Sequence, residues 1–120
     1  MDSETNIQEL KEKIKEFCEE RDWGQYHNAK ELVIGIVTEA SELLEHFRFK
    51  SYEGVDAFFK SPDKKREMSE ELADVLYFVL RLAQRYNIDL TTALNKKMEK
   101  NEQRYPVEKA RGLNKKYTEF

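Results

Sequence analysis

The segment LADVLYFVLRLA, residues 72–83, is the most informative part of the sequence for the fold. Only Asp74 and Arg81 in it are charged, and the other ten residues are Leu, Ala, Val, Tyr or Phe. A segment that is apolar on nearly every side is typical of a helix buried at the centre of its protein. Upstream, Pro62 is well placed as the first residue of a helix, which we expect to run to about Tyr86.

Three further helices are predicted by apolar residues that recur at three- and four-residue steps. Their expected ranges are 6–20, 28–47 and 89–105. Thr5 and Gln8 offer a capping box for the first of them, and residues 48–61 are expected to form a connection with one short turn. Four helices of this size are typical of an all-α, four-helix bundle-like fold. Because a helix that is apolar all round needs more cover than its three siblings provide, we expect a homo-oligomer formed through residues 28–47 and 61–86.

Length and composition fit one domain over residues 1–120, of which 105–120 form a basic and aromatic tail. The four glycines include no G-x-G pair, which excludes a phosphate-binding glycine loop. A single cysteine excludes a disulfide framework. A net charge of −3 gives no case for nucleic-acid binding, and no apolar run is long enough to span a membrane. These counts predict a soluble protein of a reducing compartment, the cytoplasm.

Two acidic pairs stand apart from the many solvated ones in this charged chain. Glu39 and Glu42 share one side of the second predicted helix, and Glu39 lies beside its apolar stripe. Glu71 opens the apolar stretch of the third helix, and Asp74 is embedded in it. Carboxylates next to a core need a proton or a positive partner. A shared divalent cation would satisfy both pairs, and hard oxygen ligands favour Mg²⁺ or Mn²⁺.

Ordinary ion pairs are the alternative explanation of these carboxylates, with Arg81, Lys30 or Arg48 as the available cations. A di-iron site of the ferritin kind is excluded. Such sites need Glu-x-x-His, whereas Gly24 and Leu43 stand three residues before the two histidines.

The spacing Glu39-x-x-Glu42, 28 residues, Glu71-x-x-Asp74 resembles the all-α nucleoside triphosphate pyrophosphohydrolases, the MazG-like family. The segments RDWGQYH, KMEKNEQRYP and KYTEF are similar to its dCTP pyrophosphatase branch. The resemblance covers nearly the whole chain. It implies Mg²⁺-dependent hydrolysis of a nucleoside triphosphate, dCTP or a related dNTP, to the monophosphate and pyrophosphate. It also implies a homotetramer built as a dimer of dimers.

The same resemblance assigns roles to individual residues. The metal ligands and catalytic carboxylates would be Glu39, Glu42, Glu71 and Asp74, with Glu39 or Glu42 as candidate general base. The nucleotide would be bound by Trp23, Gly24, Gln25, Tyr26, His27, Phe49, Phe78, Lys97, Asn101 and Tyr105. Aromatic rings stack on bases, which suits Trp23 and Phe49, although both could instead pack in the core.

Three positions depart from the branch and leave the choice of base open. Phe78 stands where a tyrosine is expected, Ile14 where vertebrate members carry a pocket histidine, and Glu31 where an asparagine is expected. A different class of function is also open, a non-catalytic oligomeric interaction module whose acidic residues keep it in solution. The tail KARGLNKKYTEF could bind an acidic partner or fold back toward phosphates.

Overall fold

A computed structural model describes all 120 residues, and it contains helices and no strand, which confirms the all-α class. The helices are α1 (Ile7–Glu20), α2 (Ala29–Glu45), α3 (Tyr52–Phe58), α4 (Pro62–Arg85), α5 (Leu90–Arg104) and α6 (Val107–Ala110). Short 3-10 turns lie at Gly24–Tyr26 and Tyr117–Glu119. The chain divides into two compact units, Met1–Asn87 and Ile88–Phe120, and each is described by itself. That residues 1–120 act as a single domain stays a prediction.

Side-chain caps set the starts of the long helices. The Asn28 side chain accepts from the backbone N–H of Glu31 at the start of α2, and Ser61 caps α4 with Pro62 at its first turn. The capping box expected at Thr5 and Gln8 is wrong, because Asn6 and Glu9 form it one residue later. An Asn carbonyl caps a helix as well as a Ser or Thr hydroxyl does, so Thr5 had no advantage.

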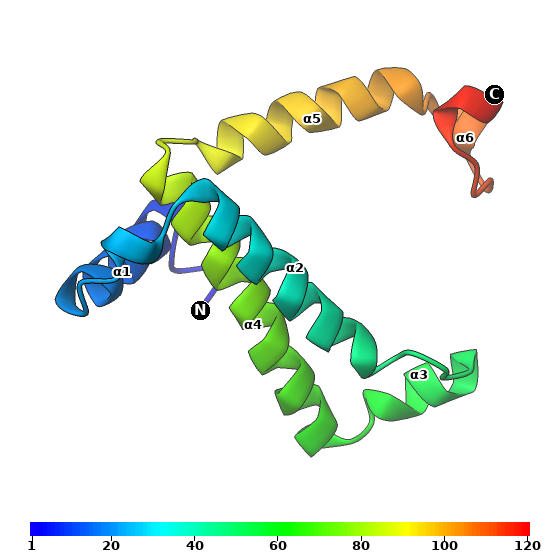
Figure 1. Cartoon of the computed structure of the whole chain (residues 1–120). Coiled ribbons are helices and arrows are strands. Elements are labelled where there is room, and N and C mark those ends of the chain that lie inside the picture. Colours follow the sequence, from blue (N-terminus) through cyan, green and yellow to red (C-terminus); the bar gives the residue numbers. More distant parts are fainter. The chain divides into compact units, whose positions relative to one another are not determined.

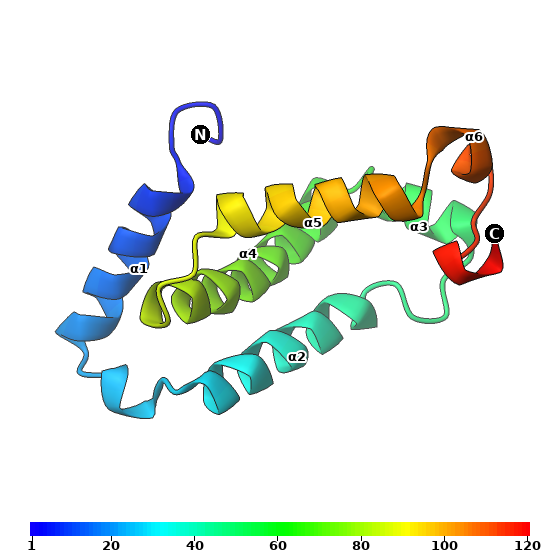
Figure 2. The same ribbon diagram turned by 90° about the horizontal axis from the view of Figure 1, so that it is seen from above.

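The first unit is built on α2 and α4, which run side by side in opposite directions and are joined at one end through α3 (Figures 1 and 2). Helix α1 packs against α4. The two long helices approach closely at Gly35 of α2, where a Cβ atom would stand 2.5 Å from the ring of Phe78. This pairing fixes which residues of α2 and α4 face each other.

The core of this unit is small, and α4 is buried over only part of its length. Leu80, Arg81 and Ala83 are buried. Leu72 and Leu76, in the same apolar stretch, are 52% and 47% exposed. The central burial predicted for this helix is therefore not achieved within a single chain.

The second unit consists of α5, α6 and the C-terminal 3-10 turn. Tyr105 meets the rings of Tyr117 and Phe120 edge-on, with centroids 5.9 and 5.8 Å apart. The tail is thus folded onto the end of α5. Leu94 and Met98 of α5 are 62% and 50% exposed. None of the helices is long and apolar enough to cross a membrane.

Candidate metal and nucleotide site

Four carboxylates from the paired helices α2 and α4 act on one another. Hydrogen bonding to Glu42 is the largest cause that raises the pKa of Glu39 above its ordinary value, followed by burial. The negative charges of Glu42, Asp74 and Glu71 raise it further. The structure therefore brings the two acidic pairs predicted from the sequence into one electrostatic site.

Two oxygen atoms of this site are buried, Oε2 of Glu39 and Oε2 of Glu71. The Glu39 atom has no hydrogen-bond partner. The Glu71 atom meets Nε2 of His46, which is a partner only when that nitrogen carries a proton. A buried carboxylate oxygen without a partner is costly, so the site is incomplete without a proton or a cation.

These carboxylates fit a hard divalent cation by their chemistry, since they supply oxygen ligands and an unpartnered buried atom. No three His, Cys, Asp or Glu side chains already stand close enough together to form a coordination sphere. Binding would therefore require rotamer changes at the ends of these side chains. The ligand roles of Glu39, Glu42, Glu71 and Asp74 stay predictions.

None of the three cations considered for ion pairs makes a salt bridge with the four carboxylates, and the one such contact joins Glu71 to His46. Arg48 lies 3.7 Å from Glu45, on the exposed side of α2. The Arg81 side chain bonds His27 and Gln84 instead of a carboxylate.

The predicted nucleotide loop, Trp23–His27, is fastened to the C-terminal end of α4 by two arginines. Arg81 Nε donates to Nδ1 of His27 at 3.0 Å. Arg85 donates from Nε to the carbonyl of His27 and from Nη2 to the carbonyl of Gly24, each at 3.3 Å. Burial lowers the pKa of His27 most, and the charges of Arg81 and Arg85 lower it further. The loop therefore carries a neutral imidazole next to two cations.

The other side chains of this loop are open to solvent to different degrees. Trp23 is 38% exposed and packs edge-on against Phe17 with centroids 5.5 Å apart. Tyr26 is 64% exposed, and Gln25 donates to the side chain and carbonyl of Asp22. Trp23 thus packs against Phe17 and also keeps an accessible face, so core packing and base stacking are compatible roles for this residue.

Phe49 follows α2 and is not a core residue, because it is 92% exposed. Its φ of 71° lies in the left-handed region, which a bulky side chain rarely adopts. The guanidinium carbon of Arg48 lies 4.7 Å from its ring centroid. An exposed aromatic ring on a strained backbone is a feature of ligand-contacting segments, which supports a role in base stacking.

Phe78 is occupied by packing, since its ring lies against Gly35 and meets the Tyr77 ring edge-on with centroids 5.1 Å apart. The hydroxyl of Tyr77 is 3.2 Å from Sγ of the fully buried Cys18. Burial and this contact raise the pKa of Tyr77 far above its ordinary value. Phe78 has no hydroxyl, and that of Tyr77 is engaged with Cys18, so neither residue offers a free hydroxyl to a substrate.

The remaining predicted residues, Lys97, Asn101 and Tyr105, lie in the second unit. They recur along α5 and at its C-terminal cap at four-residue steps, so they share one face of the helix. Their part in the nucleotide site stays a prediction.

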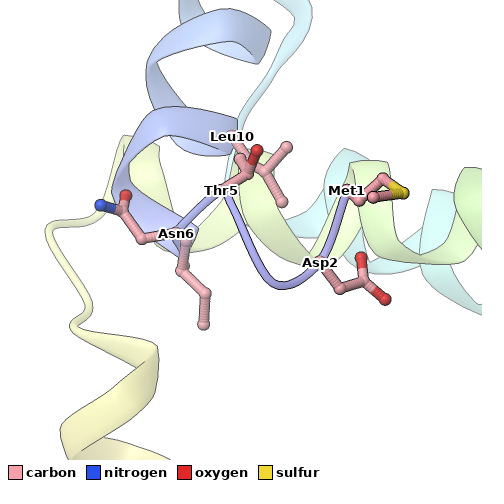
Figure 3. A pocket seen from close by; sticks show the side chains of 6 residues that line it. Met1, Asp2, Thr5, Asn6 and Leu10 are labelled. Atoms are coloured by element: carbon pink, nitrogen blue, oxygen red, sulfur yellow. The ribbon is translucent and has the colours of Figure 1, made fainter.

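A hollow of about 360 Å³ lies elsewhere, at the N-terminus and the first turn of α1 (Figure 3). Its walls come from Met1, Asp2, Thr5, Asn6, Ile7 and Leu10. None of the predicted site residues lines it, and we assign it no role.

Two residues of the site were not foreseen in their actual roles. His46 was given no place in the site from the sequence, yet it contacts Glu71. Arg81 was considered a counterion for carboxylates, yet it bonds His27. The available signal was an arginine inside an apolar helix, because a buried charge requires a buried polar partner; the identity of that partner depends on the tertiary fold.

Comparison with known proteins bears on the whole chain. The sequence profile of the MazG-like family matches residues 34–120. Over 98% of its length the chain is 38% identical to dCTP pyrophosphatase 1 of Rattus norvegicus and 37% identical to that of Homo sapiens, and it spans 69% of each relative. The crystal structure of a pyrophosphatase from Archaeoglobus fulgidus matches with a TM-score of 0.75 and 39% identity, over 83% of this chain and 92% of that one.

Proposed function

The chain belongs to the MazG-like family, and from this premise we propose its substrate, its cofactor and the residues that serve them. The resemblance found in its acidic motifs is confirmed. It is a nucleoside triphosphate pyrophosphohydrolase that acts on deoxynucleoside triphosphates. The finer proposal is that dCTP or a closely related dNTP is the substrate, with the monophosphate and pyrophosphate as products.

The observation that carries the proposal is the unpartnered, buried Oε2 of Glu39 within a group of four carboxylates. An enzyme of this class uses a divalent metal cofactor, and oxygen-only ligands support Mg²⁺, with Mn²⁺ as a substitute. Glu39, Glu42, Glu71 and Asp74 would hold it. When bound, the metal supplies neutralisation of phosphate charge and a lowered pKa of water.

The residues of the chain divide the remaining work. The rings of Trp23 and Phe49 offer accessible faces for stacking on the base, worth about 1–3 kcal/mol each. His27 and the backbone from Gly24 to Tyr26 form the held loop next to Trp23, whereas Phe49 follows the opposite end of α2. Lys97, Asn101 and Tyr105 would contact the triphosphate or the sugar. Phe78 would contribute by packing against Gly35 of α2.

We extend the proposal to the assembly, a homotetramer built as a dimer of dimers. Apolar residues left exposed on α2 and α4 support it, because a second copy of the chain would cover them. They are Val33, Val37, Leu44, Leu72 and Leu76. No nucleic acid or membrane partner enters the proposal. The single free cysteine, Cys18, supports placing the enzyme in the cytoplasm.

The proposed function can be tested directly by incubating the purified protein with Mg²⁺ and a panel of NTPs and dNTPs. The products are then separated by ion-exchange chromatography. We expect monophosphate and pyrophosphate in equal amounts, with the highest kcat/KM for dCTP or a close relative. Release of inorganic phosphate in place of pyrophosphate would exclude attack at the α-phosphorus. Absence of turnover with every nucleotide would favour the non-catalytic interaction module instead.

A further inference from the structure

Arg81 is the most deeply buried charged side chain of the molecule, at 2% exposure. It makes no salt bridge with a carboxylate. Its guanidinium donates from Nε to Nδ1 of His27 at 3.0 Å and from Nη1 to Oε1 of Gln84 at 2.5 Å. Burying a cation on two neutral acceptors is expensive, so the arrangement calls for a function that a neutral core residue would not supply.

The bond to His27 fixes the chemical state of that ring. Arginine has only donors and keeps its charge in proteins. Nδ1 of His27 must therefore offer a lone pair to Arg81, which leaves the ring neutral with its proton on Nε2. Nε2 has no hydrogen-bond partner in the chain and is not fully buried. The loop thus presents one N–H donor of defined direction.

The position of this donor suits the nucleotide of the proposed function. Arg81 lies seven residues after Asp74 on α4, so about 10 Å of helix separates the two at roughly 1.5 Å per residue. That spacing resembles the separation of a base from the phosphates within one nucleotide. The Trp23 ring stands edge-on to the His27 ring, with centroids 6.2 Å apart.

We propose that Arg81 is a positioning residue for nucleotide recognition, which holds His27 as the Nε2–H tautomer so that the ring donates to a carbonyl or ring-nitrogen acceptor of the base. This inference rests on the proposed function. A pocket with a fixed donor favours bases that offer an acceptor there and rejects an analogue without one. The charges of Arg81 and Arg85 also oppose protonation of the ring, which keeps Nδ1 available.

The tautomer can be read directly in the free protein by long-range ¹H–¹⁵N correlation of its histidine rings. The chain has two histidines, and the signals lost in His27→Phe identify those of His27. We expect a protonated Nε2 and an unprotonated Nδ1 at pH 8, above the ordinary pKa of the ring. A protonated Nδ1 in the wild-type protein would overturn the inference.

Arg81→Met removes the donor and retains an apolar side chain of similar length. We expect its His27 ring to become a mixture of tautomers. Arg85→Met is the matched control, because Arg85 carries the same charge to the same loop but bonds only backbone carbonyls. Its His27 tautomer should match that of the wild type. An unchanged tautomer in folded Arg81→Met would also overturn the inference.

Kinetics separate positioning from a merely structural role. Arg81→Met should raise KM for dCTP about three- to tenfold, as expected for one lost hydrogen bond, with little change in kcat. In the His27→Phe background the same substitution should have no further effect on KM. An equal KM increase in both backgrounds would contradict the proposal. If Arg81→Met does not fold, the wild-type tautomer and the nucleotide titration below still decide.

The nucleotide titration follows the His27 signals while α,β-methylene dCTP is added in the presence of Mg²⁺. The enzyme cannot hydrolyse the methylene bridge between the α- and β-phosphorus atoms of this analogue. We expect the Nε2 signal of His27 to shift on binding. Turnover of dCTP with an unmoved His27 signal would overturn the inference and leave the proposed function standing. A shifted signal without turnover of any nucleotide would support the inference and overturn the proposed function. If the His27 signal does not shift and no nucleotide is turned over, the inference and the proposed function are both overturned.

Discussion

At the scale of single residues, Glu39 connects the stability of the protein to its chemistry. Its pKa is raised by hydrogen bonding to Glu42, by burial and by three negative neighbours. A raised pKa means that the metal-free fold binds the Glu39 proton more tightly than the unfolded chain does. This contribution to stability is present below the unfolded pKa of about 4.5 and is lost as the pH rises through the folded value.

The first prediction is that Glu39→Gln stabilises the metal-free protein at pH 7.5 and weakens its response to Mg²⁺. The amide removes one of four like charges, so Tm without metal should rise by a few degrees. Millimolar Mg²⁺ should raise Tm of the wild type by ligand linkage and that of the variant much less. Thermal melts with EDTA and with Mg²⁺ measure both effects.

Glu45→Gln is the matched control, since Glu45 lies on the exposed side of α2 and pairs with Arg48. Its response to Mg²⁺ should equal that of the wild type. An equal loss of the Mg²⁺ response in both variants would mean that the metal acts as a general counterion, and Glu39 would leave the ligand set.

His27 gives the second prediction, with the opposite pH dependence. Its pKa is lowered from 6.5 by burial and two arginines, so the unfolded chain binds the proton first as the pH falls. The contribution of His27 to stability is complete above about pH 6.5 and declines below it. Urea unfolding at pH 7.5 and 5.5 should show a smaller loss of stability in His27→Phe than in wild type. An identical loss of stability in the two proteins would show that His27 does not contribute to the pH dependence of unfolding.

At the scale of elements, local sequence determines the helices and tertiary contact determines the site. Pro62 and Asn28 mark helix starts through short-range bonds that need no distant partner, so both were predictable. The partner of Arg81 lies 54 residues away, and no spacing rule connects such positions. The acidic pairs were predictable because each lies on one helix face, whereas the contact between His46 and Glu71 depends on the register of α2 against α4.

That register gives the third prediction, at Gly35. A Cβ atom there would stand 2.5, 2.6 and 2.8 Å from three carbon atoms of the Phe78 ring. Overpacking of this kind costs about 1–3 kcal/mol, against a gain of roughly 0.5–1 kcal/mol from alanine in a helix. Gly35→Ala should therefore lower the free energy of unfolding by about 1–2 kcal/mol, measured by urea denaturation.

Gly24→Ala serves as the comparison, because its Cβ atom would meet only the flexible ends of Arg85 and Arg81, at 3.7 and 3.9 Å. Its stability should stay close to that of the wild type. If Gly35→Ala were as stable as Gly24→Ala, the close approach of α2 and α4 at Phe78 would be refuted.

At the scale of the whole molecule, the chain leaves one apolar row on each of its paired helices uncovered. On α2, Val33, Val37 and Leu44 are 46%, 60% and 58% exposed, and they lie away from the side that faces α4. The central burial predicted for residues 72–83 is therefore reached only in an assembly, where other copies of the chain cover these side chains. A single sequence reveals how much apolar surface needs cover, but not which copy of the chain provides it.

The fourth prediction tests this cover with Val37→Lys. A lysine on the exposed side of α2 is harmless in a monomer but places an unpaired charge inside an interface. We expect the variant to keep its helical circular dichroism, to sediment as a smaller species than the wild type, and to lose roughly tenfold or more of its turnover. Val107→Lys makes the same exchange at a 68% exposed valine on α6 and should change neither the sedimentation nor the turnover.

Wild-type sedimentation as a monomer would refute the proposed assembly. A Val37→Lys variant with wild-type size and turnover would show that the α2 row lies outside the interface.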